Sequence, residues 1–488
     1  MRTRRLSVTT ASLALLLLVV GCSRDSSPAT KPAAKRAPGP APNVVLISID
    51  TLRRDHVGCY GYPRPTTPNV DRLASEGAVF ENMISSASWT LPAHAAMLTG
   101  LADTVHGALD TDRKLADDRE TLAERLKAVG YTTAGFFSGP TLHPAYGLGQ
   151  GFDTYVDCTA YPELNAASAQ QGKGIEVGSP LQVAAMHDVS SPRVYAAFQA
   201  WMKEPHPRPF FLFLHFYDPH FDFIPPPPYD TLFDPNYQGT VTGQNFIFDD
   251  QVNAQMPRRD LDHLIALYDG EIAWTDAHVG KVLDDLDAAG LRDSTLVVLL
   301  ADHGIEFFEH NGKGHRHTLF DELIRIPFIL RYPGHVPSGQ RYGPQTSMID
   351  VVPTVLELVG LPAATNVMGQ SVVPLLKGGK LAQDNLAVSE LFSLGRAFRS
   401  FRRLDRKLIR QEPTGKALVF DLKADPGERT PVGDASSVLA QAARHDAEQG
   451  SQWLVNFLKT LPRNTGGPEL PDKVRKQLES LGYLRGKE

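Results

Sequence analysis

Acidic residues and histidines follow directly after three apolar segments of this chain. They are Asp50 after segment 43–49, then His215, Asp218 and His220 after segment 209–214, and Asp302 and His303 after segment 294–301. Carboxylate oxygens and imidazole nitrogens are common ligands of divalent cations. Acids also end strands simply because turns are polar, but the threefold repetition favours a shared site. The pattern therefore predicts one divalent cation (Ca, Mn or Zn), with room for a second.

A hydroxyl group is predicted to lie near this site. In segment 88–100, Pro92 suits the first turn of a helix that Gly100 ends, which places Thr90 just before the helix N-terminus. Free backbone N–H groups and the helix dipole favour an anion there. Next to a cation, the Thr90 hydroxyl could attack a phosphoryl or sulfuryl centre. The alternative is that Thr90 only caps the helix.

The elements that must position these residues alternate between strands and helices. Apolar runs without a polar period are typical of parallel strands buried on both faces, and ligands gather at the carboxyl edge of such sheets. Further helices are predicted over 68–77, 117–129, 260–289 and 351–359, and further strands over 131–137 and 326–330. The expected fold is α/β, a large, mostly parallel sheet sandwiched by helices over 43–385.

A smaller C-terminal subdomain is predicted over 386–488. Short alternating segments near 407–409 and 417–420, with turns at Pro413 and Pro426, indicate antiparallel strands. Two amphipathic helices are expected around 436–460 and 471–481. Segments 162–180 and 225–256 are expected to be long surface insertions that could shape a substrate pocket.

The N-terminus has the features of a bacterial lipoprotein signal. Three arginines precede a short apolar core, and Val19-Val20-Gly21-Cys22 resembles a lipobox. We expect residues 1–21 to be a signal peptide, Cys22 to be lipidated and residues 22–42 to be a flexible linker. The predicted location is the bacterial cell envelope, either the outer membrane or the periplasm, with the lipid as the membrane anchor. The alternative is a plain secretory signal.

Composition excludes some classes of protein. The net charge of −6 and the absence of a basic run in the body argue against a nucleic-acid partner. Three cysteines, one of them Cys22, cannot build a disulfide scaffold, so a buried core must stabilise the chain. The sequence gives no indication of oligomeric state.

Five segments resemble, in order, the sulfatase family of the alkaline phosphatase superfamily. They are NVVLISIDTLRRDHVGCYGY (43–62), TLPAH with LTG (90–94 and 98–100), DHG (302–304), FDELIRIP (320–327) and DLKADPGE (421–428). The resemblance implies an ester hydrolase with one divalent metal held by Asp50, Asp302 and His303, and with Thr90 at its edge. It also implies that His220 contacts the ester and that Arg316 occupies a lysine position of the family.

The departures from the family pattern bear on the chemistry. Sulfatases use a Cys or Ser that is converted to formylglycine, whereas this chain has Thr90 and so resembles a threonine-containing branch. A threonine lacks the second hydroxyl through which formylglycine eliminates sulfate, whereas water can hydrolyse a phosphorylated threonine. His94 stands where the motif has Arg, and Thr51 replaces a second Asp.

Several histidines could serve either a second cation or the bound oxyanion. The candidates are His94, His215, His220, His315 and His317, together with Asp218. His315 follows His303 by twelve residues, a spacing similar to that of phosphoethanolamine transferases. Two cations would clamp the attacking and leaving oxygens. The alternative is that these side chains donate hydrogen bonds to the substrate, with His220, Arg316 and His317 as catalytic contacts.

The predicted function is hydrolysis of an anionic ester, with Thr90 as nucleophile and a phosphodiester or phosphonate ester as the preferred substrate. The first alternative is a sulfuric ester hydrolase that acts without formylglycine. The second is a family member that binds oxyanions without turnover, against which the retained Asp50, Asp302 and His303 argue.

Overall fold

The computed structural model describes residues 41–159, 190–382, 385–412, 414–462, 466–481 and 483–484. The predicted signal peptide, Cys22, nearly all of the linker and the 162–180 insertion lie outside these residues. Within the described part of the chain, we find no helix with the length and apolar character needed to cross a bilayer.

The centre of the fold is a nine-stranded sheet with the order β11-β2-β10-β6-β1-β5-β3-β4, in which β9 pairs with β2. Its strands are β1 (Asn43–Ile49), β2 (Ala78–Ile84), β3 (Thr132–Phe137), β4 (Thr154–Asp157), β5 (Phe210–Phe216), β6 (Thr295–Ala301), β9 (Arg325–Ile326), β10 (Phe328–Arg331) and β11 (Gln340–Ser347). Only β9 and β10 run antiparallel to their neighbours in the described sheet. This confirms the predicted mostly parallel sheet.

The three apolar segments that precede the candidate ligands are neighbouring strands. β1 lies between β5 and β6, parallel to both, and Ile47 pairs with Leu214 on one side and Leu299 on the other. Every residue of the three strands is buried. Their carboxyl ends therefore meet at one edge of the sheet, as the sequence predicts.

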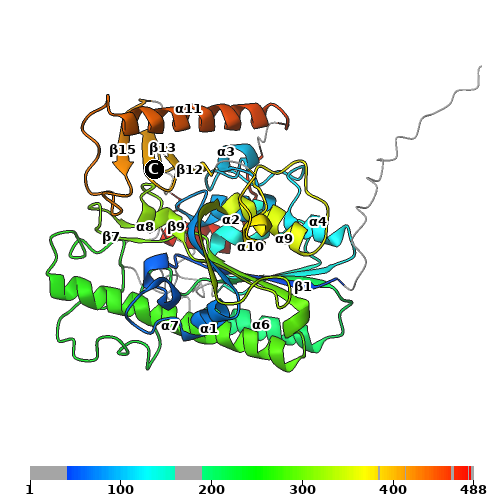
Figure 1. Cartoon of the computed structure of the whole chain (residues 1–488). Helices are drawn as coiled ribbons and strands as arrows, with labels where there is room; N and C mark the ends of the chain where they lie inside the picture. Colours follow the sequence, from blue (N-terminus) through cyan, green and yellow to red (C-terminus); the bar gives the residue numbers. More distant parts are fainter. Residues whose placement is uncertain are drawn as a thin grey trace, which may run out of the picture. The chain divides into compact units, whose positions relative to one another are not determined.

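Helices cover both faces of the sheet (Figure 1). One face carries α1 (Pro68–Ser75), α6 (Ser191–Lys203) and α7 (Arg258–Ala288). The other carries α2 (Thr90–Thr99), α3 (Asp103–His106), α4 (Leu122–Lys127), α9 (Val351–Leu358) and α10 (Val373–Leu376). Short 3-10 turns occupy Arg54–His56, Gly58–Tyr60, Pro140–Leu142, Pro144–Tyr146, Arg292–Ser294 and Met348–Asp350, and β7 (Glu306–Phe307) pairs with β8 (Lys313–Gly314). Segment 217–257 contains no helix or strand, in agreement with the predicted insertion.

Two helices begin at residues other than those predicted. α4 starts only at Leu122, because the Thr121 side chain accepts from Glu124 N (3.1 Å) and Glu124 accepts from Thr121 N (2.8 Å), which forms a capping box. α2 starts at Thr90 rather than Pro92, since Trp89 has extended backbone angles. Proline is tolerated within the first turn, where its missing N–H would have no helical partner.

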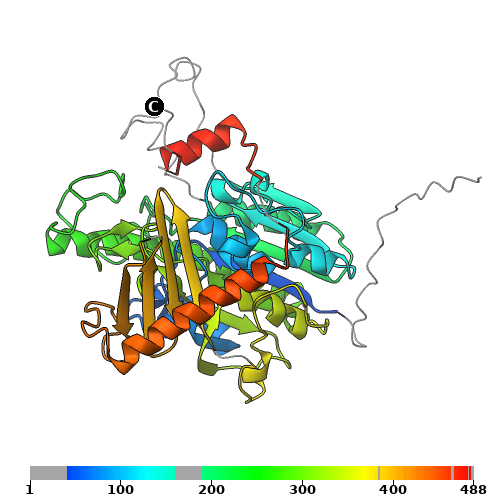
Figure 2. The same cartoon turned by 90° about the horizontal axis from the view of Figure 1, so that it is seen from above.

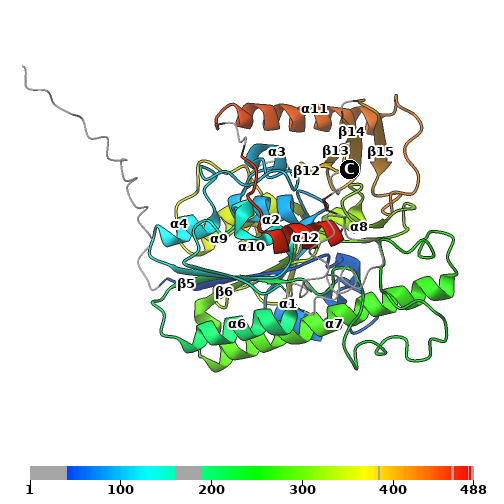
Figure 3. The same cartoon turned by 180° about the vertical axis from the view of Figure 1, so that it is seen from behind.

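A four-stranded antiparallel sheet follows the main sheet in sequence. Its strands are β12 (Ala387–Ser393), β13 (Arg396–Arg402), β14 (Arg406–Gln411) and β15 (Ala417–Asp421), and α11 (Val438–Leu458) lies across them (Figure 2). The second predicted helix, α12 (Asp472–Ser480), instead lies beside the 3-10 turn Pro140–Leu142, which follows β3 of the main sheet (Figure 3). The chain thus returns from the small sheet to the main one.

A buried ion network joins the two sheets. Lys407 on β14 is 0 % exposed and contacts Asp321 Oδ1 at 2.9 Å and Glu428 Oε1 at 2.8 Å. Asp321 begins α8 (Asp321–Ile324) and also pairs with Arg402 at 2.7 Å. Burial raises the pKa of Glu428 to about 7. Two of the five family-like segments, 320–327 and 421–428, therefore contribute to the contact between the sheets.

Candidate active site

The predicted metal ligands converge at the carboxyl edge of β1 and β6. Asp50 follows β1, whereas Asp302 and His303 follow β6, and their donor atoms lie within 4.8 Å of one another. All three side chains are 0 % exposed. The Thr90 hydroxyl, on the first residue of α2, lies 3.4 Å from Asp50 Oδ2 and 3.4 Å from His303 Nε2. The structure thus brings the four residues of the predicted metal set together.

The chemistry of these buried atoms fits a divalent cation. Asp302 Oδ1 accepts from Thr51 N (3.1 Å) and His303 N (2.7 Å), which fixes the carboxylate, whereas Asp302 Oδ2 has no hydrogen-bond partner in the described structure. Asp50 Oδ1 likewise lacks one. Burial raises the pKa of Asp50 to about 7, and burial together with the Asp50 charge raises the pKa of Asp302. Two adjacent buried carboxylates without a cation are unfavourable.

His94 is brought to the centre, but both of its ring nitrogens are already hydrogen-bonded. Nδ1 lies 2.9 Å from the Thr90 carbonyl oxygen, which can only accept, so Nδ1 carries the proton. Nε2 then accepts from Ser48 Oγ at 2.9 Å. Although His94 lies 3.6 Å from Asp302, this tautomer leaves it no free lone pair. The donor atoms of His94, His215 and Asp302 lie within 4.8 Å of one another, so a second-metal or oxyanion contact of His94 stays a prediction. In the structure, its hydrogen bond with Ser48 ties α2 to β1.

A second cluster combines two predicted histidines with a tyrosine from the C-terminus. His220 Nε2 lies 3.0 Å from His315 Nε2 and 2.8 Å from the Tyr483 hydroxyl, which is also 3.2 Å from His315 Nε2. His220 Nδ1 donates to the Phe221 carbonyl oxygen (2.8 Å), so its Nε2 is an acceptor. The rings of His303 and His315 are 4.6 Å apart, which places this cluster next to the metal ligands.

Tyr483 is a candidate residue that sequence reasoning missed. It follows α12 and lies 168 residues after His315 in the chain. A single tyrosine near a chain end carries no motif, and only the return of α12 to the main sheet brings it to the histidines. Burial raises the pKa of Tyr483 well above its ordinary value, so its hydroxyl keeps its proton at neutral pH.

Arg316 lies beside the N-terminus of α2 but already has an acidic partner. Its guanidinium stacks over Trp89 (4.0 Å) and Tyr483 (5.0 Å), donates to Ser393 Oγ (2.6 Å) and forms an ion pair with Asp110. One guanidinium nitrogen, Nη1, is buried without a hydrogen-bond partner in the part of the chain described. Arg316 can therefore offer one N–H group to an anion, although Asp110 balances its charge.

Two further predicted residues have other partners. The Asp218 carboxylate accepts from the backbone N–H groups of Ser190 and Ser191 at the start of α6. His317 Nε2 pairs with Glu306 Oε2 at 2.6 Å on β7. Asp218 therefore caps a helix, which corrects its predicted contact with a second metal or an oxyanion. His317 is paired with Glu306, and its catalytic contact stays a prediction.

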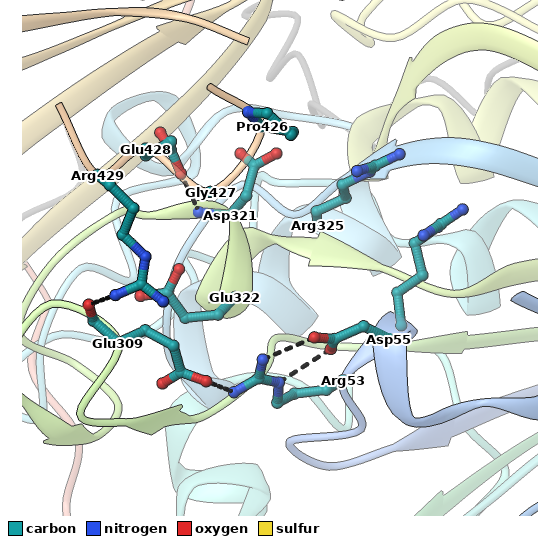
Figure 4. A pocket seen from close by; sticks show the side chains of 11 residues that line it. Arg53, Asp55, Glu309, Asp321, Glu322, Arg325, Pro426, Gly427, Glu428 and Arg429 are labelled. Carbon is teal, nitrogen blue, oxygen red and sulfur yellow. Dashed lines mark hydrogen bonds and ion pairs between the residues drawn. The ribbon is translucent and has the colours of Figure 1, made fainter. Parts of the chain in front are cut away.

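A charged pocket of about 200 Å³ lies outside this centre (Figure 4). It is lined by Arg53, Arg54, Asp55, Glu309, Asp321, Glu322, Arg325, Pro426, Gly427, Glu428 and Arg429. Its acids and bases largely satisfy one another: Arg53, for example, pairs with Asp55 at 2.7 Å and Glu309 at 2.5 Å. None of the predicted metal ligands lines it. We therefore place the chemistry at the buried centre rather than in this pocket.

The fold and the centre define an ester hydrolase of the alkaline phosphatase superfamily. The sulfatase family model matches residues 42–361, and the C-terminal model of N-sulphoglucosamine sulphohydrolase matches residues 309–444. The chain belongs to the sulfatase family.

Relatives of the chain include sulfatases of different organisms. The chain is 26 % identical over 398 residues to an ulvan-active sulfatase of Formosa agariphila, covering 79 % of this chain and 76 % of the relative. It is 27 % identical over 401 residues to human arylsulfatase A, covering 72 % and 71 %. Its fold resembles the phosphonate monoester hydrolase of Agrobacterium radiobacter, with a TM-score of 0.68 and 23 % identity over 88 % of this chain and 100 % of that one.

Proposed function

We propose that this sulfatase-family hydrolase cleaves phosphodiesters or phosphonate monoesters and uses Thr90 as its nucleophile. The observation that carries the proposal is the position of the Thr90 hydroxyl, 1 % exposed and 3.4 Å from both Asp50 and His303. Asp50, Asp302 and His303 would hold the divalent cation, which when bound supplies Lewis acidity toward the hydroxyl and the ester oxygen.

In the first step, the Thr90 oxygen attacks phosphorus and forms a P–O bond, while the bond to the leaving oxygen breaks. The Thr90 proton moves to Asp50 Oδ2, which lies 3.4 Å from the hydroxyl oxygen. Burial lowers the pKa of His220 to about 3, so this imidazole is neutral and accepts rather than donates at Nε2. The Tyr483 hydroxyl can then give its proton to the leaving oxygen, while the N–H of the neutral His315 can donate a hydrogen bond to it.

In the second step, water attacks phosphorus and the bond between phosphorus and the Thr90 oxygen breaks. His220 Nε2 accepts a proton from that water and passes it to the Tyr483 oxygen, 2.8 Å away, which restores the proton given to the leaving oxygen. Thr90 regains its own proton from Asp50. Threonine suits this route, because water attacks phosphorus directly and no second hydroxyl is required.

The preference for a monoanionic group follows from the charge of the centre. Arg316 is the one cationic side chain among the predicted site residues, and Asp110 already pairs with it. A phosphate monoester dianion would therefore lack a counter-charge beyond the metal. Diesters and phosphonate monoesters carry a single negative charge.

Sulfate esters are the second candidate substrates, because the named relatives are sulfatases. A sulfated Thr90 would have to be cleaved by water at sulfur. Clear sulfate-ester turnover with inert phosphate and phosphonate esters would decide for this candidate.

The test is a paired assay of the purified protein with nitrophenyl phosphate, bis-nitrophenyl phosphate, a nitrophenyl phosphonate and nitrophenyl sulfate. Loss of the nucleophile in Thr90→Ala should reduce kcat by about 10⁴-fold or more. Thr99→Ala is the matched control, since Thr99 lies at the other end of α2 and donates to Ala95 O at 2.6 Å. Undiminished turnover by Thr90→Ala would remove the proposed nucleophile.

The proposed location is the bacterial cell envelope, with the chain anchored by a lipid on Cys22. The support is the sequence of the first 22 residues, which has the order of a lipoprotein signal. Metabolic labelling with a fatty acid should mark the protein, and Cys22→Ser should abolish the label. Secretion of unlabelled wild-type protein would contradict the anchor.

A further inference from the structure

His215, predicted as a contact of a second cation or of the oxyanion, lies beside Asp50 and Asp302. It occupies the carboxyl end of β5, opposite Ser48 of β1 in the parallel register. Its side chain is 0 % exposed, and its Nε2 atom lies 3.4 Å from Asp50 Oδ2. Among the described residues, this Nε2 has no hydrogen-bond partner. A buried polar atom without a partner is unfavourable unless a ligand satisfies it.

The tautomer of His215 is fixed by the backbone. Nδ1 lies 2.7 Å from the Ser138 carbonyl oxygen, which can only accept, so Nδ1 carries the proton and Nε2 keeps its lone pair. His303 has the same arrangement, with Nδ1 donating to the Gly304 carbonyl oxygen at 2.8 Å. A backbone carbonyl that orients the far nitrogen of an imidazole is a common feature of metal-binding histidines.

His94 provides a contrast within the same centre. It also donates from Nδ1 to a carbonyl, but Ser48 Oγ occupies its Nε2 at 2.9 Å. The rings of His94 and His215 both lie beside Asp302. Of these two, only the ring of His215 retains a free lone pair.

We propose that His215 is a fourth protein ligand of the cation, and that the resulting set selects a borderline ion such as Zn²⁺ over Ca²⁺. The ligands are two carboxylates, Asp50 and Asp302, and two imidazoles, His215 and His303. Position 51, where the family pattern has a second acid, supplies only a threonine. Ca²⁺ takes about six to eight oxygen ligands, whereas Zn²⁺ is commonly held by about four nitrogen, oxygen or sulfur ligands.

This inference rests on the metal dependence within the proposed function, but it does not depend on which ester is cleaved. Metal binding is therefore measured without substrate, on full-length protein stripped with a chelator. Calorimetric titration with Zn²⁺ and Ca²⁺ should show Zn²⁺ binding about 100-fold more tightly or better. The visible absorption of bound Co²⁺ gives a second measurement that reports directly on nitrogen ligands.

The decisive variant is His215→Asn, whose amide N–H can still donate to Ser138 while the Nε2 ligand is lost. It should weaken Zn²⁺ binding by more than about 100-fold, because loss of a mere supporting contact to a ligand costs only about 10- to 100-fold. It should also change the Co²⁺ absorption and leave Ca²⁺ affinity within about threefold.

His278→Ala is the matched control. Like His215, His278 is buried and donates from Nδ1 to a backbone carbonyl, that of Trp274, at 3.0 Å. It lies on α7 and is not one of the proposed ligands. Its Zn²⁺ affinity should equal that of the unmodified protein. Tighter binding of Ca²⁺ than Zn²⁺ by the unmodified protein would overturn the proposal without any variant. Unchanged Zn²⁺ affinity and Co²⁺ absorption in His215→Asn would overturn it as well.

The two proposals fail in different experiments. If Zn²⁺ binds through His215 but the protein does not turn over phosphate or phosphonate esters, only the proposed substrate is rejected. If Ca²⁺ supports phosphodiester turnover and His215→Asn leaves the metal affinity unchanged, only the proposed role of His215 as a metal ligand is rejected.

Discussion

Metal binding to the free protein should release a proton at mildly acidic pH, and that proton should come from Asp50. Burial raises the pKa of this carboxyl from 3.8 to about 7, so the metal-free centre holds a proton that the cation must displace. The imidazole of His215 should not contribute, because burial lowers its pKa to about 4 and it is already neutral at pH 6.

The size of the effect follows from these values. With a pKa of about 7, about nine-tenths of the Asp50 carboxyls are protonated at pH 6 and about one-tenth at pH 8. Metal binding should then release about 0.9 proton at pH 6 and about 0.1 at pH 8, plus any share from Asp302. The apparent metal affinity should rise about tenfold per pH unit below 7 and level off above it.

The same shift makes the metal-free protein less stable as the pH rises. Between pH 4 and 7 the folded state binds a proton at Asp50 that the unfolded chain has lost, so unfolding becomes easier with increasing pH. A shift from 3.8 to about 7 corresponds to about 4 kcal/mol over that window. The bound cation takes the place of the proton and should remove this dependence.

Calorimetric titrations at pH 6 and pH 8, each in two buffers of different ionisation enthalpy, measure the released protons directly. Asp50→Asn is the control, since an amide cannot release a proton, and its release at pH 6 should fall to the share from Asp302. No proton release at pH 6 in the wild-type protein would refute the reasoning. Release that persists undiminished in Asp50→Asn would assign the proton to another group.

Three further changes test other parts of the structure. Thr90→Ser keeps a hydroxyl at the same position and should retain turnover that Thr90→Ala lacks; equal loss of kcat in both would argue against hydroxyl attack. Tyr483→Phe removes the hydroxyl that contacts His220. Because such a hydrogen bond contributes about 1–3 kcal/mol, kcat/KM should fall by about 10-fold while the metal affinity stays unchanged. A fall in metal affinity instead would make Tyr483 a positioning group of the metal centre. Lys407→Met leaves the buried Glu428 carboxyl without its cationic partner, although Asp321 keeps Arg402. It should reduce the free energy of unfolding by about 3 kcal/mol in urea denaturation, whereas the exposed Lys416→Met should not.

Much of the fold could be predicted, because the strongest sequence signals coincide with the buried elements. The apolar runs became β1, β5 and β6, and the long amphipathic stretch became α7 almost residue for residue. The errors lie where local chemistry overrides periodicity. Thr121 caps α4 well inside the predicted helix, and α12 leaves the small sheet to lie beside the turn Pro140–Leu142.

The convergence of Asp50, Asp302 and His303 could also be predicted, since strand ends in a parallel sheet must meet at one edge. The roles of the remaining residues depend on contacts that spacing does not encode. The Asp218 carboxylate accepts from backbone N–H groups that lie 27 and 28 residues away in the chain. His317 is paired with Glu306, 11 residues away. Tyr483 arrives from the far end of the chain. Nor does a sequence indicate which nitrogen of a histidine carries the proton.

Two departures from the family pattern, Thr51 and His94, change the charge of the centre in opposite directions. Thr51 removes a negative charge and His94 removes a positive one, so the two replacements together leave the net charge of the centre unchanged. Burial lowers the pKa of His94 to about 3, and the ring is therefore neutral. Two carboxylates, Asp50 and Asp302, then balance one divalent cation. Because the lost acid no longer supplies an oxygen ligand, the free lone pair of His215 is the available replacement, and a nitrogen in that place changes which cation the centre prefers.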